Sequence, residues 1–219
     1  MVNSNQRKLA LSGWLMNNAA NEYTSALKHQ KFLFFYESIS KVDDGEADFS
    51  GLKGYERGPV FSAVWGDRQH EPASFTEAAR DAYNNPNISS QINNERAKIC
   101  QFIVSVFTDR ELSDITHVMN IWKSKEPSIM SRNNVELYED DFNENDYRII
   151  KRLQTAFHID TVNNSVVIPI GSNSFVLSKQ DSLKLDAQHY DILWQIAEEE
   201  ILENPIYIEL DGDGAIIVD

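Results

Sequence analysis

Residues 29–36 read His-Gln-Lys-Phe-Leu-Phe-Phe-Tyr, and this stretch decides much of the fold. It belongs to a longer segment, residues 26–39, whose apolar positions recur at helical intervals: Leu27, Phe32, Phe35, Tyr36 and Ile39. A surface helix has one apolar stripe, whereas a helix with this many aromatic residues is buried on most sides. The sequence therefore predicts a helix over 26–39 that other elements surround.

The neighbouring patterns in the first half of the chain are also helical. Residues 7–16 have one apolar face, and Ser74–Glu77 reads as a capping box that begins a helix ending near Asn84. A longer helix is expected over 89–107. Thr108–Glu111 reads as a second capping box. Behind it, apolar residues recur at intervals of three, four and three and predict one helical face: Leu112, Ile115, Met119 and Trp122. Only a short extended segment, from Leu52 to Glu56 before Gly58-Pro59, interrupts the helices.

The second half of the chain differs from the first in composition and in the spacing of its apolar residues. Residues 124–147 are polar and acidic, and we expect a domain junction or a long surface connection there. A helix over 147–157 is followed by short β-branched runs with turn residues between them, from Ile159 to Leu177, which predict a hairpin or meander. Asp186 then begins a helix with a predicted buried face: Tyr190, Leu193, Trp194, Ala197 and Ile201. Asp211-Gly212-Asp213-Gly214 predicts a final hairpin.

The fold class predicted from these patterns is α+β. A mainly helical N-terminal domain with a short extended Gly-Pro segment is expected over 1–128. An acidic region of hairpins and one amphipathic helix is expected over 129–219. A chain of 219 residues is long enough to form either one large domain or two small ones.

Charge is unevenly distributed. The net charge is −14, and residues 131–219, with 18 acidic and 6 basic side chains, account for −12 of it. A negative field repels phosphate backbones and favours basic partners, so direct binding of nucleic acid is not expected. The alternative explanation, that the acidic residues only keep the protein soluble, stays open at this point.

Residues that bear catalytic or metal chemistry form no familiar pattern. Five histidines have no pair at the spacing of a zinc protease, and Asp211–Gly214 lacks the later ligands of a calcium loop. Cys100, the single cysteine, lies among apolar residues and suits a buried position better than a nucleophile. We therefore expect neither an enzyme nor a cofactor. No apolar run is long enough for a membrane span, and a cytoplasmic location is expected.

Three short motifs occur in a characteristic order. The first contains Gln30, Lys31 and Tyr36; the second contains Tyr55, Gly58, Pro59, Val60 and Trp65; the third contains Thr116, His117, Trp122 and Lys123. In this order and at these intervals they resemble the Panacea domain, also called SocA-like, over about residues 9–125. The family has an acidic stretch and a proline where this chain has Val118–Ile121, and residues 131–219 have no counterpart in it.

The resemblance implies an antitoxin that binds and neutralises a cognate toxin in a bacterial or phage toxin–antitoxin system. A protease or chaperone is a further partner that it implies. The competing hypothesis is a phage or mobile-element anti-defence or regulatory protein whose acidic surface covers a basic partner. The three motif segments supply these candidate partner-binding residues: Lys31, Tyr36, Arg57, Gly58, Pro59, Trp65, Thr116, His117 and Trp122. The charge pattern adds Glu198, Glu199 and Glu200.

Several of these candidates also have a purely structural explanation. Gly58-Pro59 has a sufficient backbone reason to form a fixed corner, since proline restricts its own φ and glycine permits unusual ones. His117 has an ordinary role available as a partly buried histidine bonded to a neighbouring backbone group. Glutamates at a helix end commonly form a solvated face.

Overall fold

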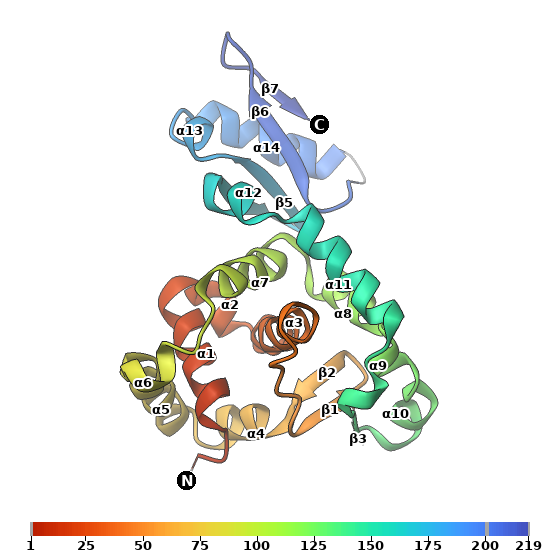
Figure 1. Ribbon diagram of the computed structural model, residues 1–219. Helices are drawn as coiled ribbons and strands as arrows, with labels where there is room; N and C mark the ends of the chain where they lie inside the picture. The colour runs from red at the N-terminus through yellow and green to blue at the C-terminus, as the bar shows by residue number, and fades with distance from the viewer. Residues whose placement is uncertain (1, 200–201, 219) are drawn as a thin grey trace.

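Helix α3 (Ala26–Asp43) is the centre of the larger part of the molecule. The computed structural model describes residues 2–199 and 202–218. In Figure 1 α3 is seen end-on, with the other elements of the first 160 residues arranged around it and the C-terminal unit above them. Every residue from His29 to Ser40 is buried. The prediction of a helix that is buried on most sides is therefore confirmed. Its many aromatic side chains fill the space between this central helix and the elements around it.

Helices make up most of this larger part. Before the first strands lie α1 (Gln6–Asn18), α2 (Ala20–Thr24) and α3; after them lie α4 (Ser62–His70), α5 (Pro72–Asn84), α6 (Pro86–Ser89), α7 (Asn94–Val106), α8 (Asp109–His117), α9 (Asn120–Lys123) and α10 (Glu126–Arg132). A 3-10 turn η1 (Glu139–Asp141), α11 (Glu144–Ala156) and α12 (Ile159–Asn164) complete it. Asn5, Ser25, Asn93 and Thr108 cap the helices that follow them with side-chain hydrogen bonds.

A small antiparallel sheet, in the order β2-β1-β3, packs beside α3. Its strands are β1 (Leu52–Tyr55), β2 (Gly58–Phe61) and β3 (Val135–Glu136). The turn between β1 and β2 is made by Glu56 and Arg57, so Gly58-Pro59 begins a strand and is not itself the corner that the sequence predicted. The polar segment after residue 124 is not a loose connection either, because β3 pairs with β1 and Leu137 is buried in the core.

The C-terminal unit contains a four-stranded sheet in the order β4-β5-β6-β7. Its elements are β4 (Ser165–Ile170), β5 (Asn173–Ser178), α13 (Lys179–Ser182), α14 (Ala187–Glu199), β6 (Ile206–Leu210) and β7 (Ile216–Val218). Both predicted hairpins, β4-β5 and β6-β7, are present, and a parallel pair between β5 and β6 joins them. The α+β class is thus confirmed.

Several local predictions were wrong. Pro72 lies in the first turn of α5, so Ser74 lies inside that helix and does not cap it. The helical face from Leu112 to Trp122 is divided between α8 and α9, because α8 ends at His117. Ile159 and Val162 belong to the short helix α12 and not to a strand.

The buried apolar residues form two hydrophobic cores. The larger core includes Trp14, Phe32, Phe35, Ile103, Met119 and Trp122, with Ile115 packed against it. It extends through Phe157 and Val162 to Val176 of strand β5. Cys100 is buried within it. The smaller core consists of six residues around the C-terminal sheet: Ile170, Phe175, Leu177, Leu193, Ile206 and Ile208. Within the described residues, no helix is long and apolar enough to cross a membrane.

Candidate functional site

Lys31 lies where the three sequence motifs meet. It is in the first half of α3, and its side chain is 1% exposed. Its Nζ donates hydrogen bonds to the carbonyl oxygen of Arg57, at 2.7 Å, and to Oγ1 of Thr116, at 2.6 Å. The central helix, the β1-β2 turn and the end of α8 are therefore joined at a single ammonium group.

Gly58 lies directly against this junction. Its φ is +109°, a conformation that side-chain-bearing residues rarely adopt. A Cβ placed on it would be 2.1 Å from Nζ of Lys31 and 2.6 Å from Oγ1 of Thr116. Glycine is thus required here for two independent reasons, backbone conformation and the close approach of the lysine.

His117 and Trp122 form the second layer of the site. Their rings stack with centroids 3.9 Å apart and planes inclined by 19°. The indole Nε1 of Trp122, which is 1% exposed, donates to the carbonyl oxygen of Tyr55 at 2.9 Å. Because Tyr55 precedes the β1-β2 turn, this bond holds α9 against the same hairpin to which Lys31 donates a hydrogen bond. Nε2 of His117 is buried and has no hydrogen-bond partner among the described residues.

The electrostatic environment of the site is unusual. Burial, together with the nearby positive charge of Arg57, lowers the pKa of Lys31 to about 7, although Asp109 acts in the opposite direction. Lys31 makes no ion pair within the described part of the chain, whereas Arg57 has Asp109 at 3.6 Å. Burial and the charge of Lys31 also lower the pKa of His117. His117 is therefore a stacked residue whose protonation the surroundings disfavour.

A cavity of about 430 Å³ opens beside Lys31. Its apolar wall comes from Ala26, Leu27, Pro59, Val60 and Trp65, and the rest of the lining is formed by Gln30, Lys31, Tyr55, Glu56, Arg57 and Asn133. Trp65 is 38% exposed and lies at the edge of the cavity, while Gln30 and Lys31 are almost fully buried. Concave sites with an apolar wall and a few polar groups are the usual form of a binding site.

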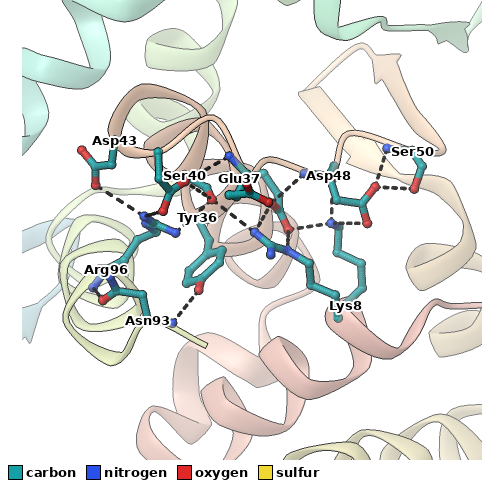
Figure 2. A network of polar contacts seen from close by, with 12 residues as sticks. Lys8, Tyr36, Glu37, Ser40, Asp43, Asp48, Ser50, Asn93 and Arg96 are labelled. Atoms are coloured by element: carbon teal, nitrogen blue, oxygen red, sulfur yellow. Dashed lines mark hydrogen bonds and ion pairs between the residues drawn. The ribbon is translucent and has the colours of Figure 1, made fainter. Parts of the chain in front are cut away.

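Tyr36 is placed elsewhere. It lies in a polar network between α1, α3 and α7, shown in Figure 2, where its hydroxyl accepts a hydrogen bond from the backbone N–H of Asn93. The guanidinium groups of Arg7 and Arg96 both lie over its ring. Tyr36 is buried, so its position supports a role in packing and not in direct contact with a partner.

The same network holds a fully buried carboxylate, Glu37. It pairs with Arg7 at 2.8 Å and with Lys8 at 2.7 Å, and it accepts a hydrogen bond from the backbone N–H of Asp48. Arg96 binds Asp44 at 2.7 Å on the other side of Tyr36. Buried charges are tolerated where they are paired and hydrogen-bonded in this way. The network (Figure 2) anchors α3 to its neighbours.

The predicted acidic residues are far from this site in the sequence, and helix α14 belongs to the C-terminal unit (Figure 1). Glu198 is exposed near the end of α14, the side chain of Glu199 is outside the described residues, and so is the whole of Glu200. The predicted buried face of α14 was wrong for two residues, because Tyr190 is 43% and Trp194 is 51% exposed. Leu193 is the fully buried position, since it faces the small sheet core. Ile201 lies outside the described residues.

Most of the predicted N-terminal residues converge, but the sequence prediction missed part of the cavity. Lys31, Arg57, Pro59 and Trp65 line it. Thr116 and Gly58 lie against Nζ of Lys31, and the charge of Lys31 lowers the pKa of His117. Leu27, Val60 and Asn133 were not among the predicted site residues. Asn133 has a φ of +69° at the end of α10, and the Asn133-Asn134 pair after a helix was the available sequence signal.

Comparison with known proteins adds no relative: no family model, no curated protein and no solved structure matches this chain.

Proposed function

We propose that this chain is an antitoxin-like protein that binds and neutralises a toxin protein, as its resemblance to the Panacea domain implies. The observation that supports the proposal is the convergence at Lys31. Residues from three motifs separated by up to 85 positions are joined there by hydrogen bonds. A partner-binding site built from the three motifs requires this convergence.

The surface around this junction has the composition of a protein-binding surface. Trp65 and the side chain of Arg57 are exposed at the cavity, and tryptophan and arginine are enriched among the residues that dominate binding energy. Other large apolar residues of the N-terminal part are also exposed: Val118, Met130 and Tyr138. We assign partner contact to Trp65 and Arg57, and a positioning role to the buried Lys31, Gly58, Thr116 and Trp122.

Co-expression with the adjacent gene tests the proposal. The neighbouring product should arrest growth when expressed alone, and this protein should restore growth. Trp65→Ala should weaken the rescue, whereas Leu183→Ala, which alters an exposed apolar residue after helix α13, should leave it intact. Melting curves of both variants check that each still folds. A neighbour that is harmless alone, or that remains toxic in the presence of this protein, would refute the proposal.

A second candidate function is suggested by the C-terminal unit. Helix α14 exposes Tyr190 and Trp194, and Asp191 and Glu198 are exposed on the same helix. An exposed tryptophan with acidic neighbours suits a partner that has a basic and apolar surface. This supports a regulatory or anti-defence protein that covers such a partner. Pull-downs at low and moderate salt test it, because binding that is indifferent to salt would contradict it.

A further inference from the structure

The C-terminal sheet has two faces, and helix α14 packs against one of them. Leu193 of α14 lies with Ile208 of β6 in the smaller core. Side chains alternate across a strand, so Tyr207 and Glu209, on either side of Ile208, point to the opposite face. Ile217 of β7 is paired with Glu209 and therefore lies on that face too. Glu209 and Ile217 are exposed there.

A groove of about 670 Å³, the sheet groove, lies on this second face. Tyr207, Glu209 and Ile217 line it from the sheet, and Asp160 and Thr161 line it from helix α12. All five residues have surface open to solvent: Tyr207 is partly exposed, Glu209 and Thr161 are exposed, Ile217 is 43% exposed, and the side chain of Asp160 is 84% exposed. A ligand in the groove can therefore contact each of them.

The sheet groove is negatively charged. Asp181 is a third acidic residue in its lining, and among the described residues that line it there is no lysine or arginine. Asp181 is paired with Lys184 at 2.7 Å, but Glu209 forms no ion pair with a described residue. Asp160 has only the exposed His158 beside it, at 3.4 Å. Two carboxylates of the groove thus lack a permanently charged partner within the described part of the chain.

The apolar part of the lining distinguishes this groove from an ordinary acidic surface. Tyr207 adds an aromatic ring and Ile217 an aliphatic side chain. A cation is attracted by carboxylates and also by the face of an aromatic ring. A guanidinium suits this combination better than an ammonium, because it is planar, stacks on rings and donates paired N–H groups to carboxylates. The groove therefore fits an arginine that has an apolar neighbour.

The charge of the chain discriminates between the possible occupants. Residues 131–219, which contain the groove, carry −12 of the net charge of −14. This field repels a nucleic acid, and a second copy of the chain would bring the same negative charge. A basic segment of another protein is complementary to the groove.

We propose that the sheet groove binds an arginine-bearing segment of a partner protein, with the guanidinium received by Glu209 and Asp160 and a neighbouring apolar side chain packed on Tyr207 and Ile217. The groove lies on the face of the sheet opposite to α14, so it is separate from the exposed surface of that helix. Binding here does not depend on the proposed antitoxin function, and a failure of either proposal leaves the other standing.

Peptides that differ only in their basic residues test the proposal. In titration calorimetry at low salt, the peptide Gly-Ile-Arg-Val-Arg-Ile-Gly, acetylated and amidated at its ends, should bind about tenfold more tightly than its citrulline counterpart, which keeps the shape and loses the charge. The lysine counterpart should bind severalfold more weakly than the arginine peptide. Added salt should weaken binding of the arginine peptide. The proposal is overturned if the arginine peptide does not bind, or if the citrulline or lysine peptide binds equally well.

Two variants with the same change of charge locate the binding. Glu209→Gln removes a carboxylate of the groove and should lower the affinity for the arginine peptide about tenfold. Asp191→Asn, the matched control, removes an exposed carboxylate of α14 and should change the affinity less than about twofold. Equal losses would show a response to net charge alone and would overturn the site. Ile217→Thr, which keeps a β-branched residue in the strand, should lower the affinity severalfold.

A measurement on the unaltered protein does not depend on how these variants fold. In spectra of ¹⁵N-labelled protein, the arginine peptide should shift the backbone amide signals of Thr161, Glu209 and Ile217. The indole signal of Trp194, on α14, should not move. Shifts confined to Trp194, or the absence of shifts at the three groove residues, would contradict the proposal.

Discussion

The two parts of this molecule differ in how far they bury their charged and aromatic residues. The N-terminal part buries charged side chains, among them Lys8, Lys31 and Glu37, together with most of its aromatic residues. Among the described residues after 164, no charged side chain is buried, while Tyr190 and Trp194 are exposed. The difference follows from the cores, because a six-residue cluster has little surface to cover an aromatic ring and few neighbours to satisfy a charge.

This contrast distinguishes residues that hold the fold from residues that are free to contact a partner. In the N-terminal part, buried charges are held by specific bonds, such as those of Glu37 with Arg7 and Lys8. A substitution there removes several contacts at once. In the C-terminal unit, the exposed aromatic and acidic residues of α14 contribute little to its core, so they are available for binding.

The largest effect is expected from a matched pair of tryptophans. Trp122→Ala removes a buried ring, its stacking with His117 and its hydrogen bond to Tyr55, and should lower the free energy of unfolding by about 3–5 kcal/mol. Trp194→Ala should lower it by less than about 1 kcal/mol, since half of its surface is already in water. Urea denaturation measures both. Equal decreases in the free energy of unfolding for the two variants would contradict the difference in burial between the two parts.

A pair of glycines gives the next largest difference. Gly58→Ala combines an unfavourable φ with displacement of Lys31 from Thr116, and should cost about 3 kcal/mol. Gly171→Ala in the β4-β5 turn also has a positive φ, +61°, but nothing lies within 4 Å of the added Cβ. It should cost only about 1 kcal/mol. Thermal unfolding of both variants checks the prediction, which fails if Gly58→Ala is the milder change.

The buried lysine should make stability depend on pH. A pKa of about 7 in the folded state, against the ordinary 10.5, means that the unfolded chain binds more protons between these values. Stability from this group should therefore rise with pH, by about 2–3 kcal/mol between pH 6 and pH 9, and be lost as pH falls through 7. The groups around it are Arg57, Asp109, Thr116 and His117.

Comparison with Lys31→Met isolates this contribution. Unfolding of both proteins at pH 6 and at pH 9 should show a smaller rise in the variant, because methionine does not titrate. The two proteins would have parallel pH profiles if Lys31 were protonated throughout this range, and that result would contradict the lowered pKa.

The smallest effect on stability is expected at the acidic end of α14. Replacing Glu198, Glu199 and Glu200 with lysine reverses three charges. Glu198, the one of these side chains that the structure describes, is exposed, and surface substitutions usually change the free energy of unfolding by less than about 0.5 kcal/mol. If a basic partner binds this unit, its association rate should fall clearly at low salt. Rates and melting curves of the triple variant measure the two effects. An unchanged rate would leave these residues as solubilising surface.

Sequence patterns predicted the elements well where one local cause was sufficient. The aromatic content of 29–36 predicted a buried helix, and Thr108 and Glu111 form the predicted capping box. The Asp-Gly repeat at 211–214 predicted the last hairpin. The patterns failed where two local causes competed: Pro72 begins α5 ahead of Ser74, and α8 ends at His117 although the apolar spacing continues.

By itself, then, the sequence determined the helical centre and the hairpins, because spacing and composition act over a few neighbouring positions. The candidate site residues came from the resemblance of three motifs to a family. The tertiary structure decided which of those residues meet. Lys31 and Thr116 are 85 positions apart, and only the packing of α8 on α3 brings them to 2.6 Å. The unpaired amide of Gln30, the buried position of Tyr36 and the exposure of Trp194 were decided in the same way, since burial depends on neighbours that are distant in the chain.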